Sequence, residues 1–365
     1  MAFATINKGA SYFNTVLWTG DGTNNRSITG VGFRPEFAWT KRRDGGQGNT
    51  NHNLWNFVVG AGNNAELASN TLGAEGASGA SEYGYISALN SDGFTLTDGT
   101  DATYKNIYTN NSGGTYVSWN WLANGTGVSN TAGSISSTIS ANTTSGFSIV
   151  SYTGTGSAAT VGHGLGVAPK MIIFKNRGNA VGWACYNSNL GNTNYIALNE
   201  SIASEAVGSV LFNSTSPTSS VFSIGTGDRT NSSSVNYIAY CFAEVKGYSK
   251  FGSYTGNGSA DGTFVYTGFK PAFLIVKRYN DAGYDWLMYD NKRQFTFNVV
   301  DDFLNPNLSA VETTGNANQS LDFLSNGVKF RGSGASSNGS GASYIYMAFA
   351  ENPFVLTDGT PVTAR

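Results

Sequence analysis

The sequence contains few of the residues that carry most enzyme chemistry. Among 365 residues there are two histidines, two cysteines and 12% charged residues, against about a quarter charged in typical domains. A histidine-based catalytic or metal site would depend on His52 or His163 alone, and the two fall at unmatched places in the chain. His163 stands in a glycine-flanked turn, which favours an ordinary turn residue over a metal ligand. We therefore expect no catalytic residue, no metal site and no cofactor.

An excess of charge of one sign and long apolar runs are also missing. The 21 lysines and arginines nearly balance 23 aspartates and glutamates, so the formal net charge of −2 offers no broad basic field for nucleic acid. The N-terminus lacks a basic start followed by an apolar core, and no stretch is long and apolar enough to cross a bilayer. We expect no nucleic acid partner, no membrane insertion and no signal peptide.

Glycine, serine, threonine and asparagine are abundant where charged residues are few. The 47 glycines favour tight turns and break helix interiors, so we expect very little helix. Hydrophobic residues make up 40% of the chain and aromatic residues 13%, which is enough apolar surface to fold. The length suits two or three domains of ordinary size.

Four landmarks recur three times in one order, which predicts three tandem copies of one module. They are an aromatic-Thr-Gly-x-Gly turn, a Gly-x-x-Pro segment that opens a strand ending in lysine, a tryptophan, and an aromatic-rich closing run. The turns begin at Trp18, Tyr152 and Tyr254, the Gly-x-x-Pro segments at Gly32, Gly166 and Gly268, and the closing runs at Tyr116, Tyr237 and Tyr344.

The repeats predict an all-β chain of three tandem jelly-roll-like, lectin-like β-sandwiches, because short strands alternate with turn residues at the spacing of a sandwich. No long connection separates the second and third copies, so these two should pack together. We place module 1, which is rich in aromatic residues, at residues 1–125, a Gly/Ser/Thr-rich linker at 126–145, module 2 at 146–247, module 3 at 248–356 and a C-terminal tail at 357–365.

The recurring tryptophan is typical of a core anchor that every copy needs. We predict that Trp55, Trp183 and Trp286 are buried at equivalent sites. Module 1 also holds five of the seven tryptophans. Its extra aromatic residues serve either core packing, which we favour, or an interface or a sugar.

Basic residues and thiols leave alternatives open. Lys41, Lys175 and Lys277 end the same strand in each copy, where they either protect a strand edge or contact an anionic polysaccharide. Cys185 and Cys241 are interpreted as small core groups, and whether they pair stays open.

Carboxylates in matching places suggest catalysis or calcium binding, but each has a plainer interpretation. Glu244 and Glu351 follow the closing strands, whereas glycoside hydrolysis needs two carboxylates that face each other across one bond. Asp98 and Asp358 stand in Asp-Gly turns, which favour tight turns over a calcium loop. We interpret all four as strand-end or turn residues, and calcium binding stays open.

The loops before the closing strands are the candidate recognition surface, because rigid sandwiches usually carry binding residues on such loops. The alternative is that they are only polar hairpin connections. The candidate receptor-contacting residues are Asn110, Thr115, Asp228, Arg229, Asn231, Ser336 and Asn338.

Three segments, residues 164–173, 254–273 and 344–354, resemble a repeat family found in virion-protein genes of marine tailed bacteriophages. The resemblance covers nearly the whole chain. That family is described mostly as tail-fibre-like or uncharacterised, so the resemblance implies a component of the phage particle and carries no catalytic residue with it. Virion proteins are made in the host cytoplasm without a signal peptide, which agrees with the N-terminus here.

The sequence therefore predicts a non-enzymatic virion protein, exposed on the particle as a tail fibre or receptor-binding appendage that contacts host-surface glycans. Its expected partners are other virion proteins, further copies in a homo-oligomer and a host-surface polysaccharide. The first alternative is a capsid decoration protein, because the chain lacks the heptads or thin repeat of a fibre stalk. A polysaccharide depolymerase is the more distant alternative.

Overall fold

The computed structural model describes residues 4–45, 50–294 and 298–362, and antiparallel sheet dominates it. Its α-helices are single turns, α1 (Ala80–Tyr83) and α2 (Ser209–Phe212), and its 3₁₀ turns are η1 (Gly9–Ser11) and η2 (Ala317–Gln319). The prediction of an all-β sandwich fold is confirmed. No helix in the described ranges is long and apolar enough to span a membrane.

Module 1 consists of a large sheet faced by a small one. The large sheet has the spatial order β1 (Phe13–Thr19), β8 (Thr115–Trp121), β3 (Phe37–Arg42), β4 (Asn53–Asn56), β5 (Leu67–Ala68). The small sheet has the order β2 (Arg26–Thr29), β7 (Gly93–Thr97), β6 (Tyr85–Asn90).

Modules 2 and 3 repeat this order, so the closing strand always lies between the opening strand and the strand that follows Gly-x-x-Pro. In module 2 the large sheet runs β16 (Glu205–Ala206), β15 (Gly191–Ile196), β14 (Ala184–Asn187), β13 (Met171–Asn176), β18 (Asn236–Phe242), β11 (Phe147–Thr153), β10 (Ser137–Asn142), β9 (Val128–Asn130), and the small sheet pairs β12 (Ala159–Gly162) with β17 (Val221–Ile224). In module 3 the large sheet runs β19 (Ser249–Thr255), β25 (Ser343–Pro353), β21 (Phe269–Arg278), β22 (Leu287–Asp290), and the small sheet runs β20 (Phe264–Tyr266), β24 (Gly327–Phe330), β23 (Leu321–Leu324).

Residues 126–145, expected as a linker, instead supply two strands to module 2. β9 pairs with β10, and β10 pairs with β11 in a register that places Ile139 opposite Val150. Both side chains are buried in the core of module 2. Serine and threonine are compatible with a strand as well as with a linker, so composition alone gave the wrong interpretation.

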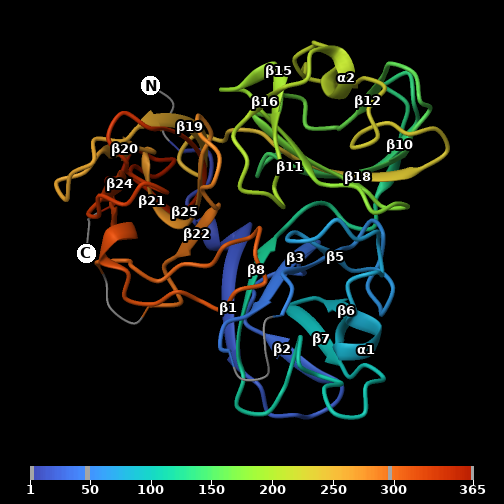
Figure 1. Cartoon of the computed structure of the whole chain (residues 1–365), viewed down its shortest axis with the longest axis horizontal. Helices are drawn as coiled ribbons and strands as arrows, with labels where there is room; N and C mark the ends of the chain where they lie inside the picture. The colour runs from blue at the N-terminus through green and yellow to red at the C-terminus, as the bar shows by residue number, and fades with distance from the viewer. Residues whose placement is uncertain (1–3, 46–49, 295–297, 363–365) are drawn as a thin grey trace.

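The three large sheets meet around one aromatic cluster. Trp121, Phe242 and Phe349 occupy the same register position in the three closing strands, because each lies between the opening strand and the Gly-x-x-Pro strand of its module. Their ring centroids are 6.3, 5.7 and 5.9 Å apart, and all three contacts are edge to face. The modules therefore surround a pseudo-threefold centre, and Figure 1 shows them as three lobes around it.

Each central strand is covered on both faces. In module 1, Trp18, Ala38 and Tyr116 face the small sheet, whereas Trp39 and Trp119 face the shared centre. A strand buried on both faces favours apolar residues, and the few charged groups that it carries need internal partners. This double burial contributes to the low charge of the sequence.

Equivalent hydrogen bonds connect each module to its neighbour. The indole N–H of Trp183 donates to the carbonyl oxygen of Ala68 at 2.9 Å, and that of Trp286 donates to Ala197 at 2.9 Å. One residue type thus connects module 2 to module 1 and module 3 to module 2. A backbone hydrogen bond recurs at all three seams, with the N–H groups of Glu75, Ser204 and Glu312 donating to the carbonyls of Arg177, Tyr279 and Arg43.

All three predicted tryptophan anchors are buried, but Trp55 is not the counterpart of the other two. Trp183 and Trp286 immediately precede β14 and β22, and the residue that precedes β4 is His52. His52 lies against the backbone of Asn305 in module 3, and burial holds its pKa well below the ordinary value. Trp55 lies inside β4, in the separate core of module 1. The alignment by residue type was therefore wrong at this site.

The repeated lysines are buried at the seams rather than exposed. Lys41, Lys175 and Lys277 have relative exposures of 1%, 0% and 0%, so they neither protect an edge nor reach a polysaccharide. Each donates to a carbonyl of its own loop, at Thr50, Val181 and Tyr284. Lys41 and Lys175 also cross the seam, to the carbonyls of Ser309 and Leu72, both at 2.9 Å.

Candidate functional site

The asparagines predicted to contact a receptor are internal braces. Asn110, Asn231 and Asn338 have relative exposures of 1%, 0% and 0%. Each side-chain oxygen accepts a backbone N–H from the aromatic-Thr-Gly-x-Gly turn of its module, at 3.2, 2.7 and 3.1 Å. Buried amides with these partners are not available to a receptor, so the prediction is wrong for all three.

The turn motif is explained by how closely these loops approach it. A Cβ on Gly20 would lie 2.0 Å from the carbonyl oxygen of Asn111, and Gly154 and Gly256 meet their loops at 2.3 and 2.4 Å. The second glycine of each motif has a positive φ, between 67° and 76°. Glycine is required at the first position for space and favoured at the second for conformation.

The other four predicted receptor residues have no shared arrangement. The Arg229 guanidinium donates to the carbonyl of Trp183 at 3.0 Å and pairs with Glu200. The Asp228 carbonyl accepts from the Tyr237 hydroxyl at 2.7 Å, although its side chain is exposed. Thr115 begins β8 and Ser336 is half-buried. The three loops therefore show no common recognition surface.

The carboxylates considered for catalysis are held in separate pairs. Glu244 bonds Lys250 at 2.7 Å, and Glu351 bonds Lys270 at 2.8 Å. Asp98 pairs with Lys105, and Asp358 accepts the N–H of Thr360 as in an ordinary Asx turn. Within the described ranges, no group of three or more histidine, cysteine and acidic residues could hold a metal ion.

The remaining titratable groups considered from the sequence are buried. His163 accepts the N–H of Leu165 at Nδ1, and burial lowers its pKa. Cys185 and Cys241 are free thiols inside module 2, and burial raises the pKa of both. They therefore do not form a disulfide, and their thiolates are disfavoured as nucleophiles.

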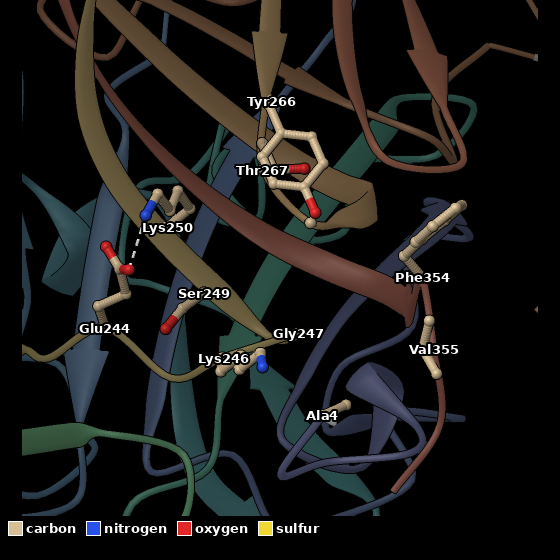
Figure 2. Close-up of a pocket in the computed structure, with 11 residues that line it drawn as sticks. Ala4, Glu244, Lys246, Gly247, Ser249, Lys250, Tyr266, Thr267, Phe354 and Val355 are labelled. Atoms are coloured by element: carbon tan, nitrogen blue, oxygen red, sulfur yellow. Dashed lines mark hydrogen bonds and ion pairs between the residues drawn. The ribbon is translucent and has the colours of Figure 1, made fainter. Parts of the chain in front are cut away.

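An open pocket of about 410 Å³ lies where modules 2 and 3 meet the chain ends. Figure 2 shows the Tyr266 ring between the Lys250 and Glu244 ion pair on one side and Phe354 on the other. Tyr266 is 59% exposed and Phe354 39% exposed, which is unusual for side chains of this size.

Backbone contacts hold the walls of this pocket in place. The N–H of Phe354 donates to the carbonyl of Gly268, two residues after Tyr266, at 3.2 Å. Among the other lining residues, the Ser249 hydroxyl donates to the carbonyl of Ala243, and the Thr267 hydroxyl donates to that of Phe269. The pocket therefore offers a ligand the Tyr266 and Phe354 rings, the Lys250 and Glu244 ion pair, Lys246, and two hydroxyl oxygens whose protons are already engaged.

Sequence reasoning missed this pocket, although both aromatic residues stand in segments that carry the repeat. Tyr266 lies two residues before a Gly-x-x-Pro landmark and Phe354 directly after the last closing strand. The sequence does contain one indication of the pocket, which is that neither Tyr266 nor Phe354 recurs as an aromatic residue in the other modules.

A family model described as a domain of unknown function (DUF7483) matches residues 8–353. This chain belongs to the DUF7483 family. The match runs through all three modules, so the DUF7483 family unit is the whole pseudo-threefold ring and not one repeat. Neither a curated protein nor a solved structure matches the chain.

Proposed function

We propose that this protein is a non-enzymatic component exposed on a bacteriophage particle, where it attaches to host-surface glycans as a tail fibre or receptor-binding appendage. The phage assignment rests on the resemblance of its repeated segments to virion proteins. The attachment role rests on the pocket between modules 2 and 3, which exposes Tyr266 and Phe354 beside the Lys250 and Glu244 pair. That pocket is the single observation that carries the binding function.

The chemistry of the pocket suits a sugar. A pyranose ring has an apolar face that stacks on an aromatic ring, and its hydroxyls both donate and accept hydrogen bonds. Tyrosine supplies apolar area and a polar tip at a small cost in side-chain entropy. The volume of about 410 Å³ falls in the range of small-molecule sites.

The binding test uses the purified full-length chain and polysaccharide extracted from the surface of the host. Calorimetry should show saturable binding, and the polymer should keep its length, measured as reducing ends after overnight incubation. Cleavage that co-purifies with the protein through several preparations would contradict the non-enzymatic proposal. Absence of binding would contradict the attachment proposal.

A capsid decoration protein is the second candidate, favoured by the pseudo-threefold ring. Three similar modules around one centre present three similar surfaces, as a threefold position in a shell of identical subunits requires. Antibody labelling of intact particles in the electron microscope separates the two candidates. Label at the tail supports the appendage, and label over the head supports decoration.

A further inference from the structure

Two exposed aromatic side chains on β20 lie in line with the pocket. Phe264 and Tyr266 are two positions apart on a strand, so both rings stand on the outer face, 44% and 59% exposed, whereas Val265 between them is buried. Residues at this spacing are about 6.6 Å apart along a strand. β20 is the edge strand of its sheet and pairs only with β24, so this outer face is open at the side as well.

The other two modules serve as internal controls for these aromatic residues. The counterparts of the buried Val265 are Ile28 in β2 and Val161 in β12, which pair with the neighbouring strand in the same way. The flanking positions of β2 and β12 carry Ser27, Thr29, Thr160 and Gly162. The fold therefore needs only the middle residue, and the aromatic pair of module 3 is not explained by packing.

A glycine makes room for the Phe264 ring. A Cβ on Gly327 would lie 2.9 Å from ring atoms of Phe264, and the Tyr266 hydroxyl oxygen would lie in ordinary contact with a Cβ on Gly268, at 3.5 Å. The two rings thus lie close to backbone while a large part of each stays exposed. Side chains that are already held in place lose little entropy when a ligand binds.

Two lysines beside these rings are paired with carboxylates. Lys329, opposite Phe264 in the sheet, pairs with Asp261 at 2.7 Å, and Lys250 pairs with Glu244 at 2.7 Å. Paired charges offer hydrogen bonds to hydroxyl groups but little net attraction to an anion. This arrangement favours a neutral ligand over an acidic one.

We infer that Phe264, Tyr266 and Phe354 form a linear platform for an unbranched, neutral polysaccharide that runs along β20 and ends in the pocket. Successive sugar rings stack on the three aromatic faces, and the Lys250 and Glu244 pair binds hydroxyls of the ring inside the pocket. This inference rests on the proposed attachment to glycans and specifies its site and its ligand class.

The test measures binding of the full-length protein to linear gluco-, galacto- and mannooligosaccharides of one to six units on a glycan array, with linear polyuronates as the acidic comparison. Affinity for a neutral series should rise up to about three units and then level off. The variants Phe264→Ser and Tyr266→Thr carry the residues that module 1 has at these positions. Each should weaken binding about tenfold or more, the scale of one aromatic stacking contact.

Tyr104→Ser is the matched control, because Tyr104 is also exposed, at 40%, but lies in module 1. It should leave affinity unchanged, and all three variants should keep the parent melting temperature. If the parent binds host polysaccharide and the two β20 variants bind equally well, the platform is wrong while attachment stands. Stronger binding to polyuronates, or no binding to any neutral series, overturns the ligand class. If the parent binds no glycan, both proposals fall.

Discussion

Replacing Trp286 with phenylalanine removes one hydrogen bond between modules 3 and 2 and keeps most of the buried ring. The indole N–H donates to the Ala197 carbonyl at 2.9 Å, and the side chain is 1% exposed. Phenylalanine has no donor, so the buried Ala197 carbonyl loses this partner. A buried polar group without a partner costs about 1–3 kcal/mol, which we expect in addition to the effect of the smaller ring.

The matched control is Trp55→Phe. Trp55 is equally buried, but its indole nitrogen has no hydrogen-bond partner in the part of the chain that the structure describes. The same substitution there changes the ring and removes no bond. The difference between the two losses in the free energy of unfolding therefore reports the lost seam hydrogen bond together with the relief of the unpaired Trp55 N–H.

Urea denaturation of both variants, followed by far-ultraviolet circular dichroism, gives the two free energies. We expect the Trp286 variant to lose about 1–3 kcal/mol more than the Trp55 variant. Equal losses would refute the argument that this bond stabilises the seam. A change in the slope against urea would mean that unfolding is no longer two-state or that the compactness of the unfolded or native state has changed, and the two free energies would then not be compared directly.

Four further results are expected. Asn231→Ala leaves the Thr155 N–H and two carbonyls without their partner and should lower the free energy of unfolding by about 1–3 kcal/mol; a neutral effect in urea denaturation would contradict its role as a brace. Lys175→Met leaves the carbonyls of Leu72 and Val181 unpaired and should be destabilising, whereas a stabilised variant would show that the buried charge outweighs these bonds. Stability should fall as the pH drops below about 6.5, because His52 takes up a proton in the unfolded state, whereas its lowered pKa prevents this in the folded state. The urea midpoints at pH 7.5 and pH 5.5 measure this fall. A His52→Gln variant with the same pH dependence as the parent would contradict the prediction. Cys185 and Cys241 should react with a thiol reagent only after denaturation; labelling of the native protein, followed by mass spectrometry, would contradict their burial.

The repeated landmarks and the all-β class could be predicted because they depend on near neighbours in the chain. Gly22 reports a positive φ within one turn, and the apolar run of β13 reports a strand covered on both faces. The strands within 126–145 were missed because their serine and threonine residues are compatible with a strand as well as with a linker.

The roles of the residues that the sequence offered as site candidates depended on distant contacts, which leave no local signal in the sequence. Lys175 donates to a carbonyl 103 positions away, and whether such a lysine is exposed or buried is decided by the neighbouring module. Asn110 reads as a loop residue until the turn 89 positions earlier is placed against it. Trp55 was predicted as the counterpart of Trp183 and Trp286, whereas His52 holds that position, because matching by residue type placed the counterpart three residues too far along the chain.

The sequence by itself determined three copies of one β module, since turns and strands are specified by residues within a few positions of each other. Only the tertiary structure decided that these copies close into a ring, because the contacts of Trp121, Phe242 and Phe349 join residues more than a hundred positions apart. It also decided which aromatic residues stay outside. β20 is as apolar as a core strand, but Phe264 and Tyr266 are exposed. Their exposure follows from the edge position of β20 and from Val265, which is the one residue of this strand that packs in the core.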